Sequence, residues 1–232
     1  MKHAWQLILS CEHATNIIPR AYQDYFKGAR ASLDSHEGWD IGAKALTESL
    51  GEALDVPSFY YPYSRLLIEV NRSVHHQRLW SSYSQNLTNK EKQTILESMY
   101  HPYREKVRDY IKKHPPVIHI SVHSFTPKLN NQVRQAEIGL LYDPGNDLDA
   151  RFCKTLKQAL KIEAPHWRVR MNYPYKGVSD GFVTSLRQEF QHQPYIGIEL
   201  ETSQALWLAP EKECECSRIA LVSAIAKSIQ GF

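Results

Sequence analysis

Short runs of apolar residues recur along the chain and predict buried β-strands. Each run has the length of a typical strand and is bounded by polar or turn-forming residues. The runs occupy residues 5–11, 58–63, 66–71, 117–124, 137–142, 167–173 and 195–201. The second and third of these predict either a strand pair or one bent strand.

Longer segments between these runs carry apolar residues at helical spacing. The segment 40–54 has Leu46, Leu50 and Leu54 on one face, close to a period of 3.6. Similar patterns cover residues 88–114, residues 147–160 and a last helix after Pro210. The second of these opens with Thr88-Asn-Lys-Glu91, which is typical of a capping box.

Strands that alternate with helices predict one α/β domain over residues 1–232. Its sheet should be mixed but mostly parallel and covered by helices on both faces. In such sheets ligands bind beyond the carboxyl ends of the strands.

Composition narrows the class of protein without naming a function. The net charge is only +3 and the basic residues are dispersed, so neither nucleic acid nor an anionic membrane is predicted as a partner. No apolar stretch approaches the roughly 20 residues that span a bilayer, and the N-terminus lacks the pattern of a signal peptide. The cysteines contain no C-x-x-C pair. A reduced, cytoplasmic protein is the simplest interpretation.

Polar residues gather at the ends of the predicted strands. His13 follows the first strand, and Asn71 and Arg72 follow a later one. His123 shares strand parity with Ser121 and with His119, which we interpret as a core histidine with hydrogen-bond partners. These positions predict a polar site at one edge of the sheet.

Carboxylates complete this group. Glu199 lies on an apolar strand, where its burial requires a cation opposite, either an arginine or a metal ion. Asp40 precedes a predicted helix, where an ordinary N-terminal acid is the alternative interpretation. Two histidines, one acid and a further carboxylate are the components of a catalytic zinc site.

Seven segments resemble the N-formylglutamate amidohydrolase family, and their order and spacing carry the signal. They are Ser10-Cys-Glu-His-Ala-Thr-Asn-Ile-Ile-Pro19, Ser35-His-Glu-Gly-Trp-Asp-Ile-Gly-Ala43, Ser64-Arg-Leu-Leu-Ile-Glu-Val-Asn-Arg72, His101-Pro-Tyr-Arg104, Ser121-Val-His-Ser-Phe-Thr126, Asn172-Tyr-Pro-Tyr-Lys-Gly177 and Gly197-Ile-Glu-Leu-Glu201. The family is similar to the zinc carboxypeptidase and aspartoacylase group. That similarity implies a phosphorylase/hydrolase-like fold.

The resemblance implies one zinc ion, or another divalent metal, held by His13, Asp40 and His123. The wider group places its acid three residues after the first histidine, but that position is Asn16 here. Asp40 is the matching acid and Glu37 is the fallback. Glu12 is disfavoured because strand parity turns it away from His13.

The resemblance also implies roles for the remaining polar residues. Glu199 would act as general base and then general acid, and Arg65 would stabilise the oxyanion. The pair Asn71 and Arg72 would hold a substrate carboxylate. For the arginines of this segment, a structural role in an ion pair with an acid such as Glu69 is the alternative. Two further residues, Lys176 and Glu201, would line the substrate pocket, with Glu201 a competing candidate for the base.

These expectations predict a zinc-dependent amidohydrolase that acts on a small-molecule N-acyl amino acid, with an acidic side chain favoured. Three alternatives remain open: a zinc carboxypeptidase, a peptidoglycan-type amidase, and a binding module without turnover. The amidase of cell walls is disfavoured because such enzymes act outside the cytoplasm.

Overall fold

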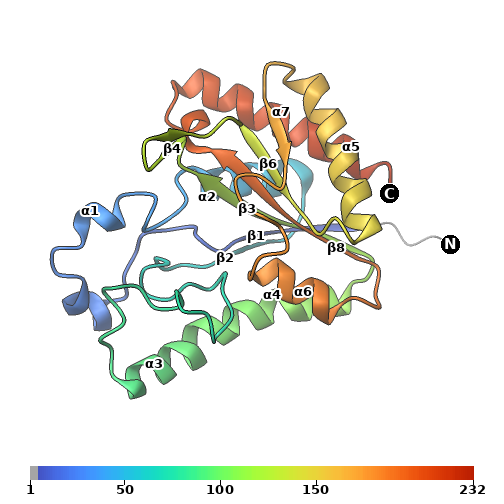
Figure 1. The fold of residues 1–232 in the computed structure, drawn as a ribbon. Coiled ribbons are helices and arrows are strands. Elements are labelled where there is room, and N and C mark those ends of the chain that lie inside the picture. The colour runs from blue at the N-terminus through green and yellow to red at the C-terminus, as the bar shows by residue number, and fades with distance from the viewer. Residues whose placement is uncertain (1–4) are drawn as a thin grey trace.

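A six-stranded mixed sheet forms the centre of the molecule, seen in a computed structural model that describes residues 5–232 (Figure 1). The strand order is β2-β1-β3-β8-β6-β7. The strands are β1 (Gln6–Cys11), β2 (Ser58–Tyr60), β3 (Val117–Phe125), β6 (Ile138–Leu141), β7 (Val169–Met171) and β8 (Tyr195–Ser203). Strands β2, β1, β3 and β8 are parallel, whereas β6 runs antiparallel to β8 and parallel to β7. The predicted mixed, mostly parallel sheet is confirmed.

Helices cover both faces of this sheet, which confirms the predicted α/β class. One face carries α2 (Ala43–Leu54), α5 (Asp147–Glu163) and α7 (Glu211–Ile229). The other carries α3 (Asn89–Ile95), α4 (His101–Lys113) and α6 (Phe182–Glu189). A π-helical turn, Leu96–Tyr100, joins α3 to α4. The short elements are α1 (Arg30–Leu33), the 3₁₀ helices Arg20–Phe26 and Gln204–Leu206, and the hairpin of β4 (Lys128–Leu129) and β5 (Gln132–Val133).

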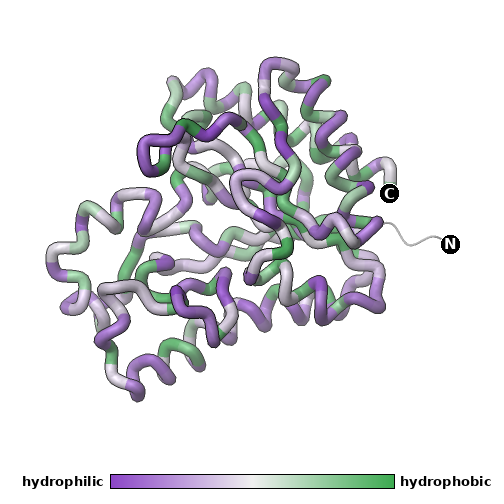
Figure 2. Tube along the Cα trace, viewed as in Figure 1, coloured by the Kyte–Doolittle hydropathy of each residue, from purple (hydrophilic) through white to green (hydrophobic). Residues whose placement is uncertain are grey.

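Alternation along the strands separates an apolar face from a polar one. On β3, Ile118, Ile120 and Val122 join the core beneath α2, α5 and α7. The intervening residues His119, Ser121 and His123 therefore point to the opposite face. In Figure 2 green segments recur along the central strands, and purple and green segments alternate along the helices. Strand parity thus places the polar residues of the predicted site on one side of the sheet.

The predicted strand 66–71 is wrong. This segment consists of turns, in which Leu67 N donates to Ser64 O at 3.0 Å and Arg72 N donates to Glu69 O at 3.0 Å. Its apolar residues are nevertheless buried in the core beneath α4. A run of buried apolar residues looks the same in sequence whether it fills the core from a strand or from a turn.

The other strands and the long helices are confirmed, with differences at their ends. The helix predicted from residue 40 begins at Ala43, after Gly42 with φ +84°. The Thr88–Glu91 capping box is present, with both reciprocal hydrogen bonds formed. The prediction omitted α6 and the 3₁₀ helix Arg20–Phe26, which lack a long periodic pattern. None of the helices in residues 5–232 is long and apolar enough to cross a membrane.

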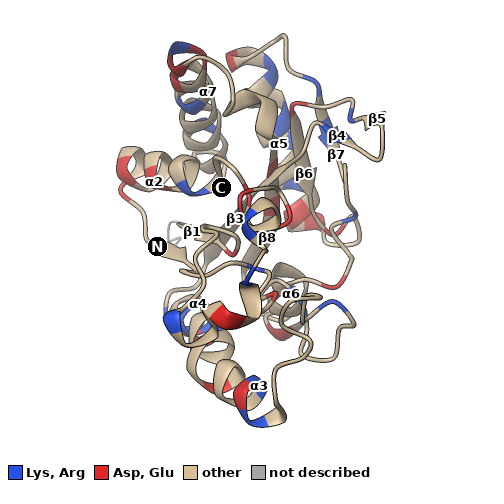
Figure 3. Cartoon of the chain, turned by 90° about the vertical axis from the view of Figure 1, so that its left-hand side faces the viewer, with Lys and Arg blue, Asp and Glu red and all other residues tan. Residues whose placement is uncertain are grey.

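Charged side chains are mixed over the outer surface. Figure 3 shows blue and red segments interspersed on α2, α3, α4 and α7. Charge of one sign is therefore not concentrated on these helices.

Candidate active site

A cavity of about 230 Å³ lies at the carboxyl ends of β1, β3 and β8. Apart from the fallback acid Glu37, every residue given a site role from the sequence lines it. These residues are His13, Asp40, Arg65, Asn71, Arg72, His123, Lys176, Glu199 and Glu201. The fold thus brings together residues that lie far apart in the sequence, from His13 to Glu201. The role of each one remains a prediction.

Strand register aligns the polar residues of β3 with those of β8. Ser121 is paired with Glu199, and His123 with Glu201, across the parallel ladder. His13 comes directly after β1, and its carbonyl accepts a hydrogen bond from Asp40 N at 3.0 Å. This bond brings the loop before α2 back against the end of β1.

His13, Asp40 and His123 form a compact buried cluster. Oδ2 of Asp40 lies 3.1 Å from His13 Nδ1 and 2.9 Å from His123 Nδ1. The two Nδ1 atoms are 3.2 Å apart. Glu37 is exposed and lies outside this group, so the geometry favours Asp40 over Glu37 as the acid beside the histidines.

A buried glutamate holds the second nitrogen of each histidine. His13 Nε2 lies 2.6 Å from Glu69 Oε1. His123 Nε2 lies 3.2 Å from Glu12 Oε2 and 2.9 Å from Ser121 Oγ. Such partners fix the orientation and tautomer of an imidazole that binds through its other nitrogen.

Glu12 and Glu69 are functional candidates that the sequence did not reveal. Parity correctly turned Glu12 away from His13, but the same parity places Glu12 on the face of β1 that looks toward Ser121 and His123. That signal was available once β1 and β3 were taken as neighbours. Glu69 was considered only as a partner for an arginine.

The electrostatics of the cluster follow from burial and close pairing. Burial alone would raise the pKa of Asp40, but the positive charge and hydrogen bonds of His13 and His123 hold it well below its usual value. The pKa of Glu12 is lowered in the same way, by His123 and by the Ser121 hydroxyl against the effect of burial. The carboxylates therefore stay ionised.

Arg65 is a structural ion-pair partner and also part of the cavity wall. Its Nη2 lies 2.5 Å from Glu69 Oε2, and its Nη1 lies 3.4 Å from Asp40 Oδ1. The pairing with Glu69 that the sequence left open is thus present. The side chain remains 28% exposed and lines the cavity, so it can also face a ligand.

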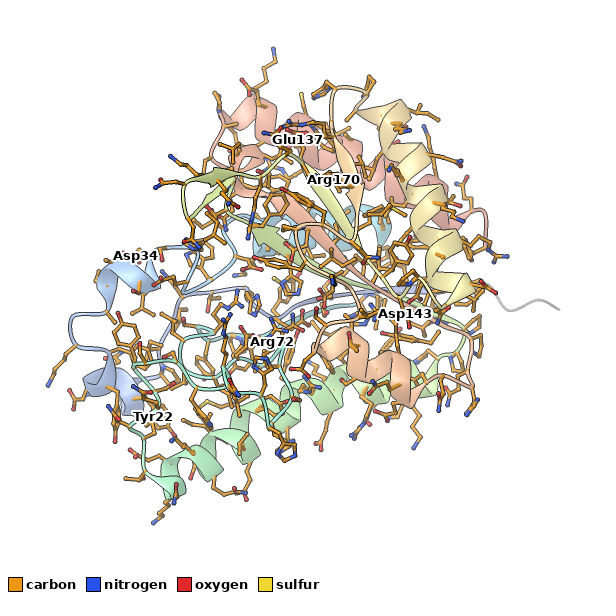
Figure 4. All side chains as sticks on the ribbon, in the orientation of Figure 1. Tyr22, Asp34, Arg72, Glu137, Asp143 and Arg170 are labelled. Carbon is orange, nitrogen blue, oxygen red and sulfur yellow. The ribbon has the colours of Figure 1, made fainter. Side chains whose placement is uncertain are left out.

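Asn71 and Arg72 are fixed by the segment that leads into α6. Asn71 Oδ1 accepts a hydrogen bond from Phe182 N at 2.8 Å. Arg72 donates to the carbonyl of Asp180, and none of the ion pairs in residues 5–232 involves Arg72. Figure 4 shows Arg72 in the interior of the view, whereas Asp34 and Tyr22 lie at its left-hand edge.

Glu199 and Glu201 form the β8 wall of the cavity. Burial raises the pKa of Glu199, and it raises that of Glu201 to about 7. Oε2 of Glu201 is buried and has no hydrogen-bond partner in the described part of the chain. A Cβ at Gly181 would lie 3.2 Å from Glu199 Oε1, so backbone approaches this carboxyl closely. A carboxyl group whose pKa is raised in a cleft is suited to proton transfer.

The loop after β7 supplies Tyr175 and Lys176 to the cavity. At Gly177 an added Cβ would lie 2.2 Å from Tyr142 N, so this loop packs its backbone directly against the end of β6.

The three clustered donor atoms fit a divalent metal ion. One ligand atom from each of His13, Asp40 and His123 lies within 4.8 Å of the others. A tetrahedral ion with bonds of about 2.0–2.1 Å separates its ligand atoms by roughly 3.3 Å, close to the spacings found here. All three side chains are buried, and the cavity leaves room beside them.

Three solved structures with similar folds extend the comparison. Gene product Atu2144 from Agrobacterium tumefaciens is 25% identical with a TM-score of 0.83, covering 98% of this chain and 91% of that chain. N-formylglutamate amidohydrolase from Ralstonia eutropha JMP134 is 15% identical with a TM-score of 0.70, covering 97% and 93%. The N-acetylmuramyl-L-alanine amidase Ami1 from Mycobacterium smegmatis is 12% identical with a TM-score of 0.50, covering 99% of both chains. The last two similarities show a common fold.

Comparison with curated proteins gives no significant match. The family model of N-formylglutamate amidohydrolases, in contrast, matches residues 5–208. This range includes every strand of the main sheet and every residue that lines the cavity. The resemblance found in the sequence motifs is therefore confirmed, and the chain belongs to the N-formylglutamate amidohydrolase family of enzymes.

Proposed function

We propose that the chain is a zinc-dependent hydrolase of N-acyl amino acids with an acidic side chain. One observation carries this proposal. The donor atoms of His13, Asp40 and His123 converge in a cavity whose other walls hold a carboxyl group with a raised pKa and several cationic side chains.

Zinc is the ion that this donor set favours. Two imidazole nitrogens and one carboxylate oxygen form the ligand set of many catalytic zinc sites. Bound zinc would supply Lewis acidity, which polarises a carbonyl and lowers the pKa of water to about 7. The buried glutamates Glu12 and Glu69 would keep both imidazoles turned toward it.

Glu199 would move the protons. It lies on β8 opposite the cluster, and its raised pKa brings it closer to the range in which a carboxylate can accept a proton and later return it. It would take a proton from the attacking water and deliver it to the leaving amine. Arg65 would offset the negative charge that develops on the substrate oxygen.

Cations on the cavity wall would select an acidic substrate. Arg72, Arg78 and Lys176 line the cavity, and none of the ion pairs between residues 5 and 232 includes them. An N-acyl acidic amino acid carries two carboxylates, one on the backbone and one on the side chain. Arg72 with Asn71 would bind the first, and Lys176 is placed to bind the second.

The proposal is tested by amine release from zinc-loaded protein. N-formyl-L-glutamate is compared with N-formyl-L-glutamine, its isostere with an uncharged side chain, and with an unblocked dipeptide that a carboxypeptidase would accept. We expect formylglutamate to be cleaved fastest and Arg72→Ala to raise its KM by about tenfold or more, as for a lost charge-assisted contact. Absence of release from all three compounds, in protein with stoichiometric zinc, would overturn the proposal.

A further inference from the structure

A second cavity continues the cleft on the far side of Asp40 and Arg65. It has a volume of about 490 Å³, roughly twice that of the cavity around the metal cluster. The two share part of their walls, including Asp40, Arg65 and Tyr175. We call them the inner cavity, which contains His13 and His123, and the outer cavity.

The outer cavity lies where the acyl part of a substrate would extend. Asn71, Arg72 and Lys176 line only the inner cavity, whereas Asp40 and Arg65 line both. A substrate whose amino-acid carboxylates are held by Arg72 and Lys176 would therefore direct its acyl group past Asp40 and into the outer cavity. This step rests on the proposed function. A formyl group would leave most of that space unused.

Arg134 places a fixed positive charge on the outer wall. Its Nη2 donates to Tyr175 Oη at 3.0 Å, and its Nη1 donates to Thr126 O at 3.4 Å. The guanidinium carbon lies 5.6 Å from the ring centre of Phe125 and 5.1 Å from that of Tyr175. These contacts hold the side chain in place without neutralising it.

This arginine has no carboxylate partner among the ion pairs found in residues 5–232. Arg168, in contrast, is paired with Glu137 at 2.8 Å on the same part of the surface. A half-buried, positioned guanidinium without an anion is suited to bind one from a ligand.

The other charged residues around the outer cavity do not supply an anion that would neutralise Arg134. Arg78 is a second arginine on the wall without an ion-pair partner in the described chain, and Arg65 is already paired. Glu37 is the opposing acid, but it is exposed on the rim, and Asp40 is engaged by both histidines. The unpaired charge of the outer cavity is therefore mainly positive.

We propose that the outer cavity binds an acyl group longer than formyl that ends in a carboxylate, and that Arg134 determines this specificity. Phe125, Tyr83 and Leu129 line this cavity and contribute apolar surface for the methylene groups of such a chain. The terminal carboxylate accepts hydrogen bonds from the Arg134 guanidinium. The hydrolysis itself is that of the inner cavity, in which water is added across the amide to release a dicarboxylic acid and the amino acid.

Four L-glutamate derivatives test this proposal with zinc-loaded protein: the N-formyl, N-butanoyl, N-(3-carboxypropanoyl) and N-(3-carbamoylpropanoyl) compounds. The last two have the same shape and differ only in charge. We expect kcat/KM to be about tenfold or more higher for the carboxylate than for the carboxamide. Arg134→Ala should reduce that ratio to near unity. Arg134→Gln, which can keep the hydrogen bond to Tyr175, controls for loss of hairpin structure and should reduce it as well.

Lys128→Ala is the matched control. It removes one positive charge from the same hairpin but lies outside the cavity wall, so it should leave the ratio unchanged. If formylglutamate is hydrolysed but kcat/KM is no higher for the carboxylate compound than for the carboxamide, this inference is overturned while the proposed function stands. An equal loss of kcat/KM for all four compounds in Arg134→Ala would show a merely structural arginine. Absence of hydrolysis of any compound would overturn the proposed function and this inference together.

Discussion

The Nδ1 atoms of His13 and His123 lie 3.2 Å apart and face the same carboxylate oxygen of Asp40. Their Nε2 atoms point in other directions, to Glu69 and Glu12 respectively. Two imidazoles converge here through equivalent nitrogens, and each contacts a buried acid through its other nitrogen. This arrangement is suited to the binding of one metal ion by both rings.

The support from Glu12 can be tested without changing a metal ligand. Glu12→Gln preserves the shape of the side chain and removes the charge that faces His123. We expect zinc affinity to fall by about 10- to 100-fold, which is typical for loss of such a partner. Competition with a chromogenic chelator measures this affinity. Glu37→Gln is the control, because the exposed Glu37 lies outside the cluster and should leave zinc affinity unchanged. Equal effects of the two substitutions would contradict the assignment.

Glu199 and Glu201 should differ in their contribution to turnover. Glu199→Gln is expected to lower kcat by roughly 10²- to 10⁴-fold while zinc content stays at the wild-type level, since it removes the general base. Glu201→Gln should lower kcat much less, because Glu199 is the residue that accepts the proton in the proposed mechanism. Steady-state kinetics with metal analysis of the same samples provides the comparison. The reverse order would make Glu201 the base.

The acidic limb of the pH profile should report Glu199. Glu199 must be ionised to accept a proton, so activity is lost as pH falls through its pKa. Burial raises that pKa, which moves the limb above the usual value of 4.5. Burial, with a contribution from the charge of Glu199, raises the pKa of Glu201 to about 7. Glu201 is therefore largely neutral at the pH where Glu199 titrates, and Glu201→Gln should leave the acidic limb of kcat/KM in place. A clear shift of the limb in this variant would contradict the assignment of the limb to Glu199.

The capping box that begins α3 should contribute to the stability of the fold and not to activity. Thr88 Oγ1 accepts from Glu91 N at 3.2 Å, and Thr88 N donates to Glu91 Oε2 at 2.8 Å. Thr88→Ala is expected to reduce the free energy of unfolding by about 0.5–2 kcal/mol, measured by denaturant titration. Thr94→Ala, at an exposed position within the same helix, should cost less. Equal losses would argue against the cap as the source of the effect.

Much of the fold could be predicted because its long elements obey simple periods. Strand β3 has buried apolar residues at every second position, and α5 has an apolar stripe at helical spacing. The prediction of a strand over residues 66–71 was wrong for a physical reason. Its buried residues pack from consecutive turns, and burial alone produces the same apolar run in a turn as in a strand.

The residues that gather at the site could be predicted from the sequence, but their contacts with one another could be predicted only in part. Strand parity put His123 and Ser121 on one face, and the family motifs supplied Asp40. Sequence could not show that Glu12 and Glu69 contact the histidines, because those contacts depend on which strands are neighbours and on how the turns after β2 fold back. The outer cavity could not be predicted from the sequence either. The contact between Arg134 and Tyr175 depends on how the loops after β5 and β7 pack against each other.

Zinc titration of chelator-stripped protein shows whether hydrolysis depends on a metal ion in the proposed site. Amine release from N-formyl-L-glutamate is followed as zinc is added, in the wild type and in His123→Ala. We expect activity that rises in proportion to zinc and saturates at one equivalent per chain, with no recovery in the variant. Undiminished activity in metal-free protein, or an active His123→Ala, would contradict a catalytic metal held by His13, Asp40 and His123.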